Sequence, residues 1–412
     1  MTDDRPSTRP RSRASPEMTR LRSLSSDVGR MLEVAREHLG APARIAAAAA
    51  AAERLRGGDG RAAVFIGFSR WKQDVMRRYF PDRECVFLAA DAERITRREM
   101  AVVERFETPT VHVWSCRHPR HVEAYCAARG LTLYRVEDGF IRGVGLGLAK
   151  TAPLSLVFDA TAAHFERARP SDLERLIAEH DFAADDVLMA RARRLLARVV
   201  GGNISKYNFS DAATSLRELL PDDGRRRILV LGQVEADMSI RHGMRRPATN
   251  AEVVRRTMEE AGDAVVLFRP HPEMLRSQRR GRGTLADLPE GCVVLPVEAP
   301  LEDCFAVADR VVTMTSLAGF EAALRGLPVV TLGGPFYAGW GFTEDRDPIA
   351  RRTRRLTPLE VFAAAYLLYP RYFDPDTGAP IDAEAAVDIL ERRLADLRGT
   401  AARDRDPTRP AS

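Results

Sequence analysis

Short runs of β-branched and aromatic residues alternate with helical stretches twice along this chain, and no other feature limits its fold as strongly. The first series of expected strands covers 63–66, 86–88, 110–114 and 131–136. The second series covers 227–231, 264–268, 292–295, 310–313 and 328–331. A strand–helix–strand–helix order predicts a parallel sheet covered by helices on both faces. We therefore expect an α/β protein with two Rossmann-like halves, whose ligand site lies in a cleft at the carboxyl ends of both sets of strands.

The intervening stretches predict helices, and together with the tails they give a domain plan. Expected helices cover 27–56, 71–79, 91–106, 118–129, 250–261, 301–308, 317–325, 357–368 and 383–397. The predicted boundaries are a basic disordered tail over 1–25, an N-terminal helix over 26–58, a first Rossmann-like domain over 59–220, a second over 221–350, C-terminal helices over 351–398 and a disordered tail over 399–412. We expect the C-terminal helices to pack back over the junction between the two domains.

Composition excludes several classes of protein. A chain of 412 residues that is 45% hydrophobic and 29% charged is typical of a globular protein rather than a disordered one. The 63 basic and 58 acidic residues balance too closely for a nucleic-acid binder. Five scattered cysteines without a C-x-x-C pair favour a reducing cytoplasm over a disulfide framework or a zinc site. The longest apolar run, 45–52, is far shorter than the roughly 20 residues that cross a bilayer.

The first candidate site is the acidic pair Glu137 and Asp138, which we expect directly after the strand over 131–136. At a strand's carboxyl end, followed by Gly139, at least one carboxylate should reach the cleft and serve as a base or nucleophile. An ordinary acidic turn is the alternative. The glycine-rich stretch 141–147, with Arg142, suggests a backbone surface for close approach of a ligand, but it is not a dinucleotide-binding motif.

Two further candidates follow strands of the second series. His271 lies between two prolines after the strand over 264–268, where its imidazole can donate to a phosphate or transfer a proton. A plain capped loop is the alternative. Thr315 and Ser316 lie between a strand and a helix, where unpaired backbone N–H groups and the positive helix end favour an anion. Ser316 as a simple N-cap is compatible with that site.

Two more loops should reach the same cleft. Gln233 and Glu235 follow the first strand of the second series, and Tyr337 and Trp340 follow the last. The two aromatic rings suit stacking on a sugar or a base, and packing within the loop is equally consistent with the sequence.

Basic residues show a strong bias. Of the 63 basic residues only Lys72, Lys150 and Lys206 are lysines, and each lies beside one of these motifs, which suggests a need for a compact ammonium group. Arginine clusters at 225–227, 279–282 and 351–355 suit either anionic lipid headgroups or solvated loops.

The order of these motifs is similar to that of the KpsC/KpsS capsule polysaccharide biosynthesis family, the β-Kdo glycosyltransferases of Gram-negative capsule assembly. The matching segments are 137–147, 153–156, 169–171, 204–208, 232–235, 270–272, 313–325, 335–341 and 368–375. The resemblance runs from about 64 to 397. Leu148, Ala236 and the arginine-rich stretch 273–281 depart from the family's pattern, which bears on the acceptor and on the contacts to Kdo.

The resemblance implies a GT-B fold with an acceptor-side first domain and a CMP-sugar-binding second domain. It implies transfer of Kdo from CMP-β-Kdo, with retention, to a glycolipid or polysaccharide acceptor at the cytoplasmic face of the inner membrane, without a metal or other cofactor. Asp138 would be the covalent nucleophile, Glu137 would orient a sugar hydroxyl or act as base, and His271, Thr315 and Ser316 would neutralise the phosphate. Glu321 would hold the ribose of CMP or be a satisfied helical glutamate.

Further contacts to sugar or acceptor are expected from Arg142, Lys206, Gln233, Glu235, Tyr337 and Trp340. A single module implies one type of linkage. Two alternatives remain at this point, namely a transferase for another CMP-linked sugar acid, such as a sialic acid, and a non-catalytic component of capsule biosynthesis or export.

Overall fold

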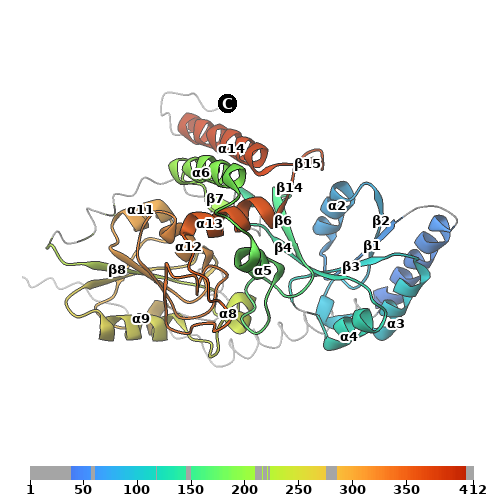
Figure 1. Ribbon diagram of the computed structural model, residues 1–412, viewed down its shortest axis with the longest axis horizontal. Helices are drawn as coiled ribbons and strands as arrows, with labels where there is room; N and C mark the ends of the chain where they lie inside the picture. Colours follow the sequence, from blue (N-terminus) through green and yellow to red (C-terminus); the bar gives the residue numbers. More distant parts are fainter. Residues whose placement is uncertain are drawn as a thin grey trace, which may run out of the picture.

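Two α/β halves lie side by side in the computed structural model, the first in blue to green and the second in yellow to orange (Figure 1). The structure describes residues 39–56, 61–116, 118–144, 150–208, 216, 220, 223–274 and 285–404. Residues 39–55 form a helix, and most of the rest of the helix expected over 27–56, together with the expected tail over 1–25, lies outside the described residues. The disordered tail expected over 399–412 is wrong for residues 399–404, which are helical, and 405–412 lie outside the described residues.

The first half contains a seven-stranded sheet in the order β15-β14-β6-β4-β3-β1-β2. Its strands are β1 (Arg61–Ile66), β2 (Arg83–Phe87), β3 (Thr110–Trp114), β4 (Leu133–Asp138), β6 (Ser155–Asp159), β14 (Arg371–Phe373) and β15 (Pro380–Ile381). Strands β2, β1, β3 and β4 run parallel, as the sequence predicts. Strand β6 pairs antiparallel with β4, and the C-terminal hairpin β14–β15 extends that edge.

Helices α2 (Arg70–Tyr79) and α4 (Arg120–Ala128) connect the parallel strands as expected. The single helix expected over 91–106 is wrong, because this stretch is broken into η1 (Ala92–Arg94), α3 (Arg97–Ala101) and η2 (Val102–Arg105). The break has a local cause. Thr96 and Glu99 form a capping box, in which the Thr96 side chain accepts from the Glu99 N–H and the Glu99 carboxylate accepts from the Thr96 N–H, so a new helix begins there.

The second half contains a six-stranded, wholly parallel sheet in the order β10-β9-β8-β11-β12-β13. Its strands are β8 (Arg227–Leu231), β9 (Val265–Arg269), β10 (Val293–Val294), β11 (Arg310–Thr313), β12 (Val329–Thr331) and β13 (Glu344–Asp345). Its helices are α8 (Met238–Gly243), α9 (Asn250–Glu260), η4 (Leu285–Asp287), α11 (Leu301–Ala306) and α12 (Leu317–Ala323). The expected strands of this half all form, with ends shifted by one residue at most.

Between and after the sheets, helices that the sequence did not predict join the expected C-terminal ones. The elements are α5 (Asp172–Glu179), α6 (Asp186–Gly201), α13 (Pro358–Phe362), the π-helical turn η5 (Ala363–Leu368) and α14 (Ala383–Asp404). Both α13 and α14 contact α6 (Figure 1). A short parallel ladder, β5 (Gly143–Val144) with β7 (Tyr207–Asn208), connects this region to the end of β4.

The cluster at 351–355 holds the second half against α5. The buried Arg352 donates to the Glu174 carboxylate at 2.9 and 3.1 Å, and Arg351 donates to the same carboxylate at 2.9 Å. Arg354 donates to three main-chain carbonyls at the end of α5. Contact with lipid headgroups or a solvated loop is therefore the wrong interpretation for these three arginines, because their donors already have partners within the protein. None of the described helices is long and apolar enough to cross a membrane.

Candidate functional site

The acidic pair is part of β4 rather than following it. The expectation that the strand ends before Glu137 is wrong, because β6 continues the pairing, with Glu137 opposite Val157 and Asp138 opposite Leu156. Successive strand residues point to opposite faces of a sheet, so the two carboxylates leave β4 in different directions. At Gly139 a Cβ atom would collide with the Ser155 side chain, so the chain can turn here only with glycine.

Asp138 has one oxygen held and one oxygen unused. Its Oδ2 accepts from Arg142 Nε at 3.0 Å. Arg142, with 1% of its surface exposed, also donates to the hydroxyl and the carbonyl of Thr151, at 3.2 and 3.1 Å, so its guanidinium is fixed. Asp138 Oδ1 is buried and has no hydrogen-bond partner among the described residues. The arrangement presents one carboxylate oxygen in a fixed direction.

Glu137 is surrounded by groups of both signs. Burial raises its pKa, while a hydrogen bond from Ser115 and the charges of Lys206 and Lys72 act in the opposite direction. Ser115 adopts a left-handed backbone conformation, with φ of 62°, just after β3. This is uncommon for a residue other than glycine and is typical of functional turns. Sequence reasoning missed Ser115, because nothing in its neighbourhood signals such a conformation.

Lys206 connects the acidic pair to the second half. Its charge lies close enough to Glu137 to lower that group's pKa, and its backbone N–H donates to Glu321 Oε1 at 3.3 Å. Glu321, only 4% exposed in α12, has its pKa raised to about 7 by burial. One carboxylate oxygen of Glu321 is thus occupied by the Lys206 N–H group. A second residue that the sequence did not reveal, His164, lies near Lys206, and burial and that lysine lower its pKa to about 3.

Neutral side chains connect the ends of β8 and β11. The Gln233 amide accepts from the Thr315 N–H at 2.9 Å and donates to Thr315 Oγ1 at 3.1 Å. Asn250 holds the Gln233 backbone through two hydrogen bonds of 2.9 Å. Both polar ends of the Gln233 amide are therefore used to position Thr315. The Gln233 amide carries a second N–H besides the one that Thr315 Oγ1 accepts, so the contact between Gln233 and a sugar stays a prediction.

His271 lies two residues beyond β9, the strand next to β8 in the sheet. Its Nδ1 accepts from the backbone N–H of Glu273 at 3.2 Å. Burial, followed by the charge of Arg269, lowers its pKa to about 4, so the ring is neutral at pH 7. Since Nδ1 is an acceptor, we assign the ring proton to Nε2, which makes this nitrogen a donor.

Four other predicted site residues have structural roles. Glu235 accepts from the Asn250 backbone and side chain at 2.8 and 3.1 Å, and Ser316 caps α12 by accepting from the Ala318 N–H. Tyr337 and Trp340 are fully buried and donate to main-chain carbonyls at 2.6 and 2.8 Å, respectively. For the two aromatic rings the structure shows the packing alternative rather than an exposed stacking surface.

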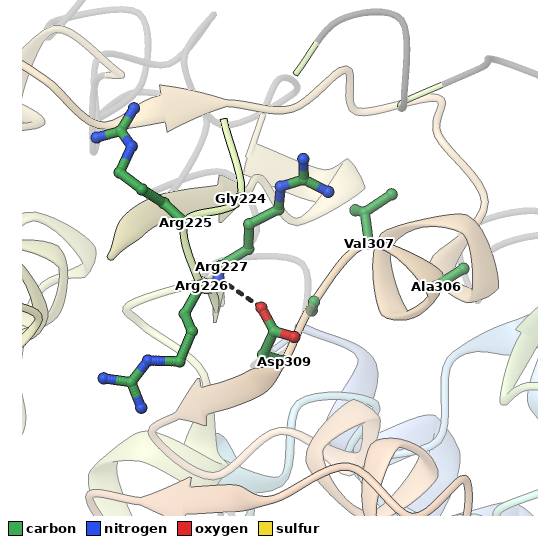
Figure 2. A pocket seen from close by; sticks show the side chains of 8 residues that line it. Gly224, Arg225, Arg226, Arg227, Ala306, Val307 and Asp309 are labelled. Carbon is green, nitrogen blue, oxygen red and sulfur yellow. Dashed lines mark hydrogen bonds between the residues drawn. The ribbon is translucent and has the colours of Figure 1, made fainter. Parts of the chain in front are cut away.

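A pocket opens at the opposite end of the second sheet, where β8 and β11 begin (Figure 2). It is lined by residues 224–227 and 306–309. The backbone N–H of Arg227 donates to Asp309 there, and Arg225 pairs with Asp223. Ligands of parallel sheets bind at the carboxyl ends of the strands, so this pocket is separate from the candidate site. The arginine cluster at 279–282 lies outside the described residues.

Comparison with known proteins places this chain in a family. The profile of the family described as capsule polysaccharide biosynthesis protein matches residues 110–372. The chain belongs to this family. It is 39% identical over 325 residues to the lipopolysaccharide-processing protein LpsZ of Rhizobium meliloti, covering 79% of this chain and 73% of LpsZ.

Two solved structures share the fold of this family member. The β-Kdo 2,4 transferase of Thermosulfurimonas dismutans KpsC is 32% identical with a TM-score of 0.66, covering 80% of this chain and 98% of that one. The β-Kdo 2,7 transferase of the same KpsC is 30% identical with a TM-score of 0.64, covering 81% and 99%. The family resemblance drawn from the motifs is thereby confirmed.

Proposed function

We propose that this protein is a retaining glycosyltransferase that moves β-Kdo from CMP-β-Kdo to a capsular or other surface polysaccharide, or to its lipid-linked Kdo primer. The observation that carries the proposal is the Asp138 carboxylate, with one oxygen held by buried Arg142 and the other without a partner. The similarity to two Kdo transferases supports the choice of donor. We also propose that the two halves form a GT-B pair, in which the C-terminal strands β14 and β15 complete the sheet of the first half.

In the first step Asp138 Oδ1 attacks the anomeric carbon of Kdo while the bond from that carbon to the CMP phosphate oxygen breaks. The electron pair of the broken bond leaves with CMP, and a covalent Kdo–Asp138 ester remains. His271 donates its Nε2 proton as a hydrogen bond to the departing phosphate. Thr315 and the start of α12 lie beside the same negative charge, which the positive end of the helix dipole stabilises.

In the second step an acceptor hydroxyl attacks the anomeric carbon from the face that CMP left. The carbon–Asp138 bond breaks, its electron pair returns to the carboxylate, and two inversions give net retention. Glu137 takes the proton of the hydroxyl. Burial raises the pKa of Glu137, which makes its carboxylate a stronger base.

Intact-mass spectrometry tests this mechanism. Wild-type protein mixed with CMP-Kdo without acceptor should gain the mass of one Kdo residue, and peptide mapping should place it on Asp138. Asp138→Ala should gain no mass and transfer no sugar, yet bind CMP with wild-type affinity in calorimetry. Transfer by this variant would refute the role of Asp138. A wild type that neither hydrolyses nor transfers from any CMP-linked sugar acid would instead indicate a non-catalytic capsule component.

We further propose peripheral association with anionic lipid at the cytoplasmic face of the inner membrane, through Arg225, Arg226 and Arg227. Arg225 and Arg226 are exposed beside the pocket of Figure 2, at the end of the second sheet opposite to the proposed site. Charges near an anionic surface contribute about 1 kcal/mol each. Flotation with anionic liposomes tests this: salt-sensitive binding that is lost in a triple Arg→Gln variant supports it, and no binding of the wild type refutes it.

A further inference from the structure

Lys72 is a half-buried cation at the proposed site to which neither the fold nor the mechanism above gives a role. It lies in the first turn of α2, and its Nζ is 2.9 Å from the centroid of the Trp114 ring. Helix α2 follows β1, Trp114 ends β3 and Asp138 ends β4. These three strands are neighbours in the sheet, in the order β4-β3-β1. Lys72, Trp114 and Asp138 therefore all lie at the carboxyl ends of these strands.

The position of Lys72 is electrostatically unfavourable unless an anion lies nearby. A helix N-terminus carries a partial positive charge, and a lysine there adds to it. The first turn of α2 contains no acidic residue, and the Ser69 side chain does not cap it. Burial lowers the pKa of Lys72 to about 8, against the opposing effect of Asp138 and Glu137. The protein thus keeps an ammonium group where burial and the helix both disfavour it.

The nearby carboxylates do not pair with Lys72. Asp138 makes its salt bridge to Arg142, and within the described residues Lys72 makes no salt bridge to either acid. An ammonium group has three N–H donors, and the Trp114 face can satisfy only one direction. The remaining donors are available to an anion that arrives beside Asp138.

We propose that Lys72 binds the carboxylate of the donor sugar and so makes the site selective for sugar acids. The proposal rests on the function proposed above. In a 2-keto sugar acid the carboxylate is bonded to the anomeric carbon, the atom that Asp138 attacks, so it must come close to the nucleophile. Two carboxylates this close repel each other unless a cation lies beside them. Arg142 is already committed to Asp138, whereas Lys72 is not.

A comparison of CMP-Kdo with a donor that lacks the carboxylate tests the proposal. For Lys72→Met we expect the KM of CMP-Kdo to rise roughly tenfold to a hundredfold, the size of a lost charge-assisted hydrogen bond. A CMP-Kdo analogue with a carboxamide in place of the carboxylate should give the same KM with wild type and variant. Affinity for CMP alone should not change. Arg70→Met is the matched control, since Arg70 is an exposed cation in the same helical turn and its loss should leave all three values unchanged.

The pH profile provides a second measurement. Since the pKa of Lys72 is about 8, the wild type should lose kcat/KM for CMP-Kdo as the pH rises through that value and the ammonium deprotonates. The facing groups are Asp138, Glu137 and Arg142, and Lys72→Arg leaves all three in place while its own charge persists. Lys72→Arg should therefore abolish this alkaline fall.

Three results would overturn the proposal. One is an unchanged KM of CMP-Kdo in folded Lys72→Met. Another is an equal loss with the acid and the carboxamide donor, which would mean that Lys72 acts on Asp138 or on the fold. The third applies if the wild type turns over no donor, so that the proposed function itself fails. Calorimetry with free Kdo then decides, and equal affinity of wild type and Lys72→Met for Kdo refutes the role of Lys72.

Discussion

The two halves of the molecule place different kinds of polar residue at the carboxyl ends of their strands, charged in the first half and neutral in the second. At the end of β4, Glu137 and Asp138 are surrounded by the charges of Lys72, Arg142 and Lys206. At the ends of β8, β9 and β11, neutral groups from Gln233, His271 and Thr315 are held by hydrogen bonds. The first half therefore gathers charged side chains around the acidic pair, and the second half holds neutral donors and acceptors in fixed positions.

This difference matches two distinct chemical demands. A nucleophile must be ionised and still have an oxygen free, which requires a cation that holds the carboxylate from one side only. A leaving phosphate already carries its charge, so it needs donors that are rigid and need not change protonation. Lys206 joins the two regions, because its charge acts on Glu137 while its backbone N–H contacts Glu321.

Removing the central cation of the first half should have the largest effect. Arg142→Met leaves the Asp138 carboxylate without its salt-bridge partner, and breaking a buried pair from one side costs about 3–5 kcal/mol. We expect that loss in urea unfolding, together with loss of transfer. Arg142→Lys keeps the charge but cannot reproduce both Thr151 contacts. Its stability and its transfer activity should therefore lie between those of the wild type and Arg142→Met. Equal stability of all three would show that Arg142 does not hold Asp138.

In the second half, the largest effect should come from His271. Removing one preorganised donor to a developing anion typically lowers kcat by about 10²–10³, and we expect this of His271→Ala, with little change in acceptor KM. His271→Gln should recover part of the rate, since a neutral donor remains. With the pKa of His271 lowered to about 4, its ring stays neutral between pH 5 and 8. Wild type and His271→Gln should therefore show the same pH profile in that range; a different profile would contradict a neutral His271.

Strand positions were predictable because runs such as 227–231 and 310–313 are rich in Val, Ile, Leu and Thr, and most of these side chains are buried. Strand β6 was not predictable, although 155–159 is similarly apolar. Its antiparallel pairing with β4 is decided by tertiary contacts. The hairpin β14–β15 joins the first sheet from the far end of the chain, which no local pattern signals.

The candidate site shows the same division between local and tertiary information. Residues directly after strands, such as His271 and Thr315, were predictable because topology alone places them at one edge. The roles of Tyr337 and Trp340 depend on what covers them, and the sequence left both alternatives open. Ser115 and His164 acquire their positions only from neighbours distant in sequence, Glu137 and Lys206, so no motif could identify them.

Glu321 provides a smaller and pH-dependent test of the boundary between the two regions. Its pKa is raised from 4.5 to about 7, so below pH 4.5 it is protonated in both the folded and the unfolded chain. As the pH rises to 7, only the unfolded chain ionises, and folding stability is lost. Glu321→Gln removes this loss. Relative to the wild type, its free energy of unfolding should increase by about 3 kcal/mol between pH 4.5 and 7 and should not increase further above pH 7. A constant difference in urea unfolding across this range would mean that Glu321 is not protonated in the folded protein.

The smallest effect is expected at Tyr337, where the structure contrasts a packed ring with a sugar-contacting one. Tyr337→Phe removes the hydrogen bond to the Ser316 carbonyl but keeps the ring stacked on Phe320, 5.4 Å away. One buried hydrogen bond contributes about 1 kcal/mol, so unfolding should shift by that amount. Because the ring has no exposed surface, the KM values of donor and acceptor should stay at wild-type levels. A rise in either KM without a loss of stability would mean that Tyr337 meets the sugar during turnover, and that the 333–341 loop must open to expose it.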